Sequence, residues 1–226
     1  MKRDVLRAIG DYRRGSGDER DIGRALARLE SFASDGDVRG RWTLVYSAKL
    51  DGGANGANGE AASSPLEFLG VSDEIVQEVT KVLYGMFFKF APWLAGSAET
   101  NRTGARNIQV VDVDAGTVRN EVDLDVPRLP TFADVVEWGD KRSSTTSTLK
   151  IGVDGEIEVE DGLARRAYVT FTRFDAQVQF ARDRATPKVS FPLPRPRGSL
   201  NTTFCDDSMR ISRGGRGGVF VLTRLT

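Results

Sequence analysis

Alternation of apolar and polar residues constrains the fold of this chain more than any other feature of its sequence. Every second residue from Trp42 to Leu50 is apolar, and a similar pattern runs through residues 118–126. Successive side chains of a strand point to opposite faces, so alternation indicates a strand with one buried face. Further strand candidates are residues 107–111, 147–153, 156–159, 166–174, 177–180, 200–204, 209–211 and 219–223. Many short strands at close spacing predict an antiparallel β-sandwich or β-barrel.

Two segments show helical spacing instead. Before residue 34, apolar residues recur three or four positions apart on both sides of a Gly-Ser-Gly break at residues 15–17, which predicts two short helices. Between Ser72 and Phe90 the same spacing predicts an inserted amphipathic helix, which Pro92 would end. We therefore expect an N-terminal helical segment at residues 1–36 and one β-barrel domain at residues 37–226.

The inserted helix runs into an apolar stretch. Residues 82–96 contain one charged residue, Lys89. Such a stretch can insert shallowly into a lipid surface, close one end of a cavity, or be an ordinary core helix. Its candidate lid or membrane-contact residues are Met86, Phe87, Phe90 and Trp93.

The composition argues against most enzymatic chemistry. The chain has no histidine, so it lacks the usual general base, triad partner and commonest metal ligand. Its single cysteine, Cys205, cannot form an internal disulfide, and a buried or strand-end thiol suits it better than a nucleophile. We expect no enzymatic activity, no catalytic residues, no metal and no cofactor.

Charge gives no strong attraction to nucleic acid. Lysine plus arginine and aspartate plus glutamate each total 32. Residues 181–197 hold five basic residues and one acidic residue, which fits a solvated loop better than a docking site. The RGGRGG run at residues 213–218 is a single copy between two strand candidates, so we interpret it as a hairpin turn and expect no nucleic-acid partner.

Two further patterns limit other roles. The DVDAG run at residues 112–116 departs from a calcium-binding loop in the places of its glycine and its acidic residues, so it predicts a hairpin turn. No apolar run reaches the roughly 18 to 20 residues of a membrane-spanning helix. The first twenty residues mix acids with bases and lack an apolar core, so we expect no secretory signal or transit peptide in this sequence.

Residues 198–224, GSLNTTFCDDSMRISRGGRGGVFVLTR, resemble the terminal signature of the plastid lipid-associated protein (PAP/fibrillin) family. The matching positions are Thr202, Thr203, Phe204, Asp206, Asp207, Arg210, Ile211, Ser212, Arg213, Gly214, Phe220, Val221 and Leu222. The segments at residues 6–15, 40–48 and 107–124 are similar to the family's helical prelude, first strand and central hairpin. The resemblance therefore covers nearly the whole chain.

The resemblance implies a mainly β fold with a single antiparallel lipocalin-like β-barrel. It also implies a plastid (chloroplast) location at thylakoids or at plastoglobules, and non-enzymatic binding or organisation of lipids or isoprenoids such as carotenoids, prenylquinones or acyl lipids. Gly40 and Trp42 are similar to the lipocalin Gly-x-Trp element, in which a late arginine packs on the tryptophan. Arg210 is the candidate for that structural role.

The leading hypothesis is a lipid-binding or lipid-coat protein whose partners are a hydrophobic small molecule and a peripheral membrane or lipid-droplet surface. Its candidate ligand-cavity residues are Trp42, Leu44, Tyr46 and Phe204. The alternative is a protein-interaction scaffold that supports an isoprenoid or prenylquinone biosynthetic enzyme. Its docking face would be the N-terminal helical segment or the basic stretch at residues 182–197.

Overall fold

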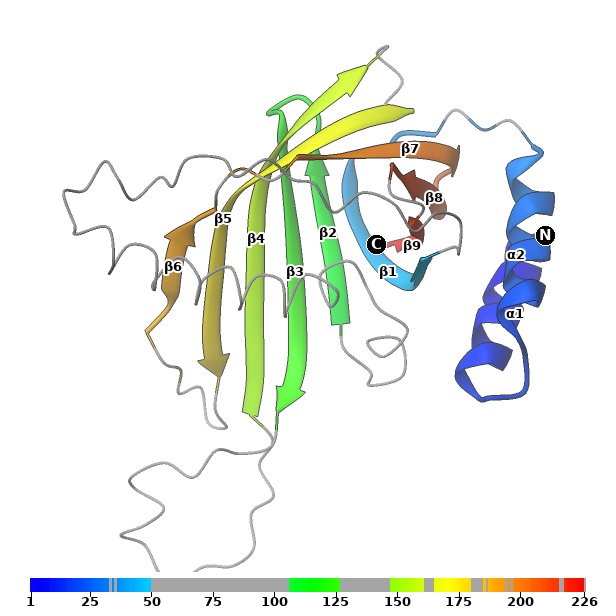
Figure 1. Ribbon diagram of the computed structural model, residues 1–226, viewed down its shortest axis with the longest axis horizontal. Helices are drawn as coiled ribbons and strands as arrows, with labels where there is room; N and C mark the ends of the chain where they lie inside the picture. The colour runs from blue at the N-terminus through cyan, green and yellow to red at the C-terminus, as the bar shows by residue number, and fades with distance from the viewer. Residues whose placement is uncertain are drawn as a thin grey trace, which may run out of the picture.

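The computed structural model describes residues 1–32, 34, 36–49, 106–126, 147–160, 165–179, 185, 187–193, 195, 197–215 and 218–225. These residues form two helices followed by nine strands (Figure 1). The elements are α1 (Lys2–Arg13), α2 (Glu19–Glu30), β1 (Gly40–Lys49), β2 (Arg106–Asp112), β3 (Thr117–Val126), β4 (Ser147–Glu160), β5 (Arg166–Gln179), β6 (Val189–Pro192), β7 (Arg197–Cys205), β8 (Met209–Gly214) and β9 (Gly218–Arg224).

The nine strands form one antiparallel sheet that closes in a ring. The strand order is β4-β3-β2-β1-β9-β8-β7-β5-β6, and a further pairing of β4 with β5 joins the two ends of the series. Strand β6 pairs with β5 at residues 173–176 and adds an edge outside the ring. The predicted mainly β, antiparallel fold with an N-terminal helical segment is confirmed. The inserted helix at residues 72–90, with Met86, Phe87, Phe90 and Trp93, lies outside the described residues.

Two hairpin predictions are also confirmed. Residues 113–116 turn the chain between β2 and β3, with Gly116 at a φ of 65°, where a side chain would be strained. Strands β8 and β9 are consecutive and pair antiparallel from Met209 to Arg213, as a hairpin at the RGGRGG run requires.

The structure corrects the strand boundaries. Residues 147–153 and 156–159, predicted as two strands, form the single strand β4, and residues 166–174 and 177–180 belong mainly to the single strand β5. Asp154 and Gly155, which lie between the two predicted strands, are part of β4, at an irregularity where the β4–β5 register shifts by one residue. The extra residue at this bulge is Thr172 of β5, and a bulge bends a strand without ending it, so β4 continues through Asp154 and Gly155.

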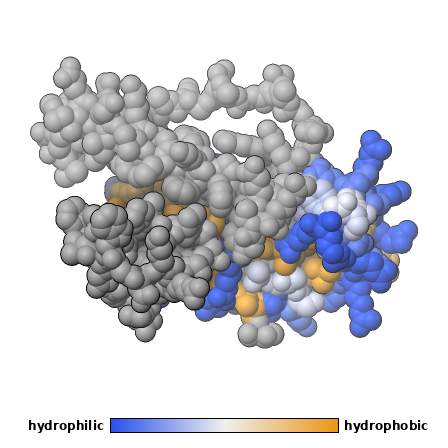
Figure 2. Space-filling view, turned by 90° about the horizontal axis from the view of Figure 1, so that it is seen from below, coloured by the Kyte–Doolittle hydropathy of each residue, from blue (hydrophilic) through white to orange (hydrophobic). Residues whose placement is uncertain are grey.

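The two helices cover the outer face of part of the ring. Their buried residues are Val5, Ile9, Ile22, Leu26 and Leu29, which pack with Tyr46, Phe204, Met209, Ile211, Val219 and Val221 in the cluster we call the helix-side core. In Figure 1 the helices lie beside β1, β7, β8 and β9. The predicted apolar stripe of the helices is therefore buried against strands. Figure 2 shows that the outer edge of the molecule on the right, where the helices lie, is mostly hydrophilic.

Glu30 fastens the end of α2 to the sheet. Its carboxylate accepts hydrogen bonds from Arg213 Nε at 2.8 Å and Nη2 at 2.7 Å, and from the Thr203 hydroxyl at 2.5 Å. The Glu30 side chain is 13% exposed, so this is a largely buried, two-pronged ion pair.

We expect Glu30→Ala to lower the free energy of unfolding by about 2 kcal/mol, because it leaves the Arg213 guanidinium without its carboxylate at the helix–sheet contact. Urea unfolding followed by circular dichroism measures this loss. Glu19→Ala is the matched control, since Glu19 accepts only an exposed hydrogen bond from Tyr12. Equal losses in both variants would contradict the anchoring role of Glu30.

Candidate functional site

Trp42 is fully buried and contacts two arginine side chains. The guanidinium carbon of Arg210 lies 5.0 Å from the centre of its ring system, and that of Arg224 lies 4.2 Å from it. Both distances fall within the range of cation–π contacts. Trp42 points into the ring from β1, while Arg210 and Arg224 come from β8 and β9, so the stack ties three strands together.

Hydrogen bonds fix the orientation of this stack. The indole N–H of Trp42 donates to the Val38 carbonyl at 2.8 Å, and Arg210 Nη1 donates to the same oxygen at 3.3 Å. Arg210 Nη2 donates to Gln109 Oε1, and Gln109 Nε2 donates to Asn120 Oδ1 at 3.0 Å. A partly buried chain of polar side chains therefore extends from the stack across β2 and β3.

Arg224 holds the segment that leads into β1. Its Nη1 donates to the Arg39 carbonyl at 2.8 Å, and its Nη2 donates to the Asp37 carbonyl at 2.7 Å. Gly40 has a φ of 108°, and a Cβ there would lie 2.9 Å from Arg224 Nη1. Glycine thus meets both a backbone and a space requirement. We did not foresee Arg224 or Gln109 from the sequence, because only the strand register brings them to Trp42.

The ring interior near the stack contains a small, partly open cavity. Its free volume is about 20 Å³, and its lining residues are Val38, Gln109, Val111, Val118, Ile157, Ala167, Val169, Leu200, Thr202, Arg210 and Ser212. Pockets that enclose small organic ligands usually measure about 300–1,000 Å³. This cavity is on the scale of a water molecule or a small polar group.

The structure brings together only two of the four predicted cavity residues. Trp42 and Leu44 pack inside the ring with Val118 and Leu222, whereas Tyr46 and Phe204 belong to the helix-side core. The strand register shifts between Leu44 and Tyr46, and again between Thr202 and Phe204. Each bulge moves the side chains that follow it to the opposite face of the sheet. Counting every second residue in the sequence does not reveal this change of face. A ligand-contact role for these residues stays a prediction.

The basic stretch at residues 182–197 is neutralised where it is described. Arg195 Nη2 lies 2.6 Å from Glu156 Oε2, and Arg197 Nη2 lies 2.6 Å from Glu158 Oε2. Lys188 Nζ lies 3.0 Å from Asp175 Oδ2. Arg182 and Arg184 lie outside the described residues. The carboxylates of β4 and β5 therefore offset the local positive charge that suggested a docking face.

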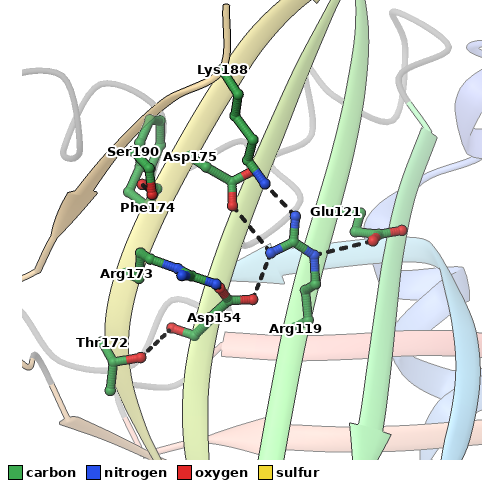
Figure 3. A network of polar contacts seen from close by, with 9 residues as sticks. All are labelled: Arg119, Glu121, Asp154, Thr172, Arg173, Phe174, Asp175, Lys188 and Ser190. Carbon is green, nitrogen blue, oxygen red and sulfur yellow. Dashed lines mark hydrogen bonds and ion pairs between the residues drawn. The ribbon is translucent and has the colours of Figure 1, made fainter.

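A second polar cluster lies on the outer face of β3, β4 and β5 (Figure 3). Arg119 reaches across β4, with its Nη1 atom 2.5 Å from Asp154 Oδ1 and 3.1 Å from Asp175 Oδ1. It passes over Gly152, where a Cβ would lie 2.7 Å from Asp175 Oδ2. Arg173, Lys188 and Glu121 complete the cluster, which holds three cationic and three anionic groups. Its charges are matched, so we interpret it as structural.

The groups with altered titration do not form a reactive centre. Burial raises the pKa of the Cys205 thiol to about 11 and that of the Tyr46 hydroxyl to about 12, so both stay protonated at neutral pH.

Among the described residues, no three of the acidic or cysteine side chains group as metal ligands. No helix in the described part of the chain combines the length and apolar character needed to cross a bilayer.

Comparison with known proteins finds one family. The family model described as PAP_fibrillin matches residues 80–223, close to two thirds of the chain. No curated protein and no solved structure matches the chain.

Proposed function

Since this chain belongs to the PAP_fibrillin family, we propose that it binds or organises lipids at thylakoid or plastoglobule surfaces in plastids, without catalysing a reaction. Family membership is the observation that carries the proposal, because the family is generally lipid-associated and not catalytic. In this proposal the closed ring acts as a lipocalin-like barrel.

The packing of the ring favours action at a lipid surface over enclosure of a whole lipid. Near Trp42 the interior is occupied by side chains such as Leu44, Val118 and Leu222, and the cavity there has room for only a small polar group. A second interior cluster, with Val122, Ile151 and Phe174, fills the inner face of β3, β4 and β5. A carotenoid or prenylquinone would need far more space than this part of the ring offers.

Liposome flotation combined with ligand titration tests the proposal. We expect the protein to float with galactolipid vesicles that contain a prenylquinone, and to form no one-to-one complex with free carotenoid in fluorescence titrations. A tight one-to-one carotenoid complex would replace the surface role with that of an enclosed carrier. Absence of both flotation and ligand binding would refute lipid association.

Three exposed apolar side chains favour a scaffold as the second candidate function. Met1, Leu6 and Phe32 are 53%, 40% and 49% exposed on the helical segment, whose other face is buried on the sheet. Exposed apolar groups on a hydrophilic face are suited to a protein partner. The partner proposed is an isoprenoid or prenylquinone biosynthetic enzyme.

Substitution tests the scaffold better than deletion, because α1 and α2 cover the helix-side core. We expect Leu6→Glu combined with Phe32→Glu to leave the fold intact and to remove partners recovered from plastid extract by the wild-type protein. Leu26→Ala is a matched control for stability, since Leu26 is 2% exposed and cannot contact a partner directly. Partners unchanged by the double substitution would exclude the helical docking face.

A further inference from the structure

Arg210 is a buried cation without an anionic partner among the described residues. It is 4% exposed, and its hydrogen bonds go to the neutral oxygens of Val38 and Gln109. Its Nε has no hydrogen-bond partner. Arg224, which contacts the same Trp42 ring, carries the same sign of charge.

This arrangement is energetically unusual. A buried charge is normally paired, because removal from water costs several kcal/mol that only an opposite charge and good hydrogen bonds offset. Burial lowers the pKa of Arg210 to about 10, so the guanidinium remains charged at neutral pH. The neutral carbonyl and amide oxygens satisfy two of its N–H groups but supply no countercharge.

The cavity beside Arg210 has the polarity of an anion site. Thr202 and Ser212 line it, and their hydroxyl oxygens lie 3.2 Å apart, so one hydroxyl donates to the other and the second hydroxyl keeps its proton available. No aspartate or glutamate is among the described residues that line it. The cavity therefore offers a cation and a hydroxyl donor with no competing acid.

The remaining wall is apolar and the cavity is partly open. Ile157 and Leu200, both partly buried, line it together with the buried Val169. A charged head that enters such a cavity can keep its carbon chain along this apolar wall while the rest of the chain stays outside. The free volume of about 20 Å³ limits the inserted part to a small group.

We propose that this cavity binds a carboxylate group, with the Arg210 guanidinium and one hydroxyl of the Thr202–Ser212 pair as donors. The carboxylate belongs either to a long-chain fatty acid or to a small free acid. A fatty acid as the ligand depends on the proposed lipid function. It would mean that the protein prefers lipids with a carboxylate head group. Charge-assisted hydrogen bonds favour an ionised carboxylate over a neutral hydroxyl or ester.

Calorimetric titration of the full chain with dodecanoate, 1-dodecanol and acetate tests the proposal. We expect dodecanoate to bind at least about tenfold more tightly than dodecanol, which has the same chain without the charge. Equal affinities for the two amphiphiles would overturn the proposal and leave lipid association standing. Binding of acetate without dodecanoate would keep the carboxylate site, exclude the fatty-acid source and leave surface lipid association to the flotation test. If neither dodecanoate nor acetate binds, the carboxylate site is wrong.

Two variants test which side chains donate hydrogen bonds to the carboxylate. Arg210→Met is expected to abolish the preference for dodecanoate over dodecanol. Because Arg210 also stacks on Trp42, Ser212→Ala combined with Thr202→Val provides a second route that keeps the stack, and we expect it to reduce dodecanoate affinity about fivefold. Arg41→Met is the matched control, since Arg41 neighbours Trp42 in sequence but its side chain is 58% exposed. A preference that survives both cavity variants would overturn the assignment.

Discussion

Trp42→Ala is expected to lower the free energy of unfolding by about 4 kcal/mol, the upper part of the range for removing a fully buried large aromatic side chain. The indole is 0% exposed and is shared by β1, β8 and β9 through its contacts with Arg210 and Arg224. Its removal leaves a cavity and takes the aromatic face from two buried or half-buried cations. The Val38 carbonyl also loses its indole donor.

Trp42→Phe separates the ring from its N–H group. It keeps an aromatic ring for the two arginines to contact and loses the hydrogen bond to Val38, so we expect the free energy of unfolding to fall by about 1–2 kcal/mol. Chemical unfolding monitored by far-ultraviolet circular dichroism measures both variants. A loss below about 1.5 kcal/mol for Trp42→Ala would show that the Arg–Trp–Arg stack does not hold the ring together.

Local sequence patterns predicted the helices and hairpins correctly, but they did not predict how these elements pack together. The helices of residues 2–13 and 19–30 follow from their apolar spacing, and the hairpins at residues 112–117 and 214–218 follow from glycine-rich turns between alternating segments. The sequence did not show which strands the helices pack against, because that depends on which face of the sheet the helices cover. Strand β6 was also not predicted, since its four residues lie in a proline-rich stretch with no alternation long enough to detect.

The candidate site shows where single-sequence reasoning stops. Gly40, Trp42 and Arg210 were linked by resemblance to a lipocalin element, and the structure places the Arg210 guanidinium over the Trp42 ring. Tyr46 and Phe204 share the alternation of Trp42 and Thr202 in the sequence but face the helices, because one bulge precedes each of them. A bulge adds one residue to a strand without a distinctive residue type, so only the cross-strand register reveals it.

Arg119→Met is expected to lower the free energy of unfolding by about 2 kcal/mol at pH 7, because it removes the cation that joins Asp154 to Asp175 across β4. The Asp175 side chain is 7% exposed, and after the substitution it keeps only Lys188 as a cationic partner. Burial raises the pKa of Asp175, but hydrogen bonds from Arg119 and Lys188 outweigh it, so the pKa is lowered overall. Asp154 shows the same balance, with Arg119 and Arg173 as donors.

Acid should remove the difference between Arg119→Met and the wild-type protein. A carboxylate with a lowered folded-state pKa contributes stability that is full above its unfolded pKa of about 3.9 and is lost as pH falls through the folded value. We therefore expect the difference to be constant from about pH 5 to 8 and to shrink below about pH 4. Urea unfolding across this range measures it. Arg173→Met is the matched control, since Arg173 is 59% exposed and bonds only Asp154, so its effect should stay below about 1 kcal/mol. A loss for Arg119→Met that is equally large at pH 3 would mean that packing over Gly152, and not the ion pairs, makes Arg119 stabilising.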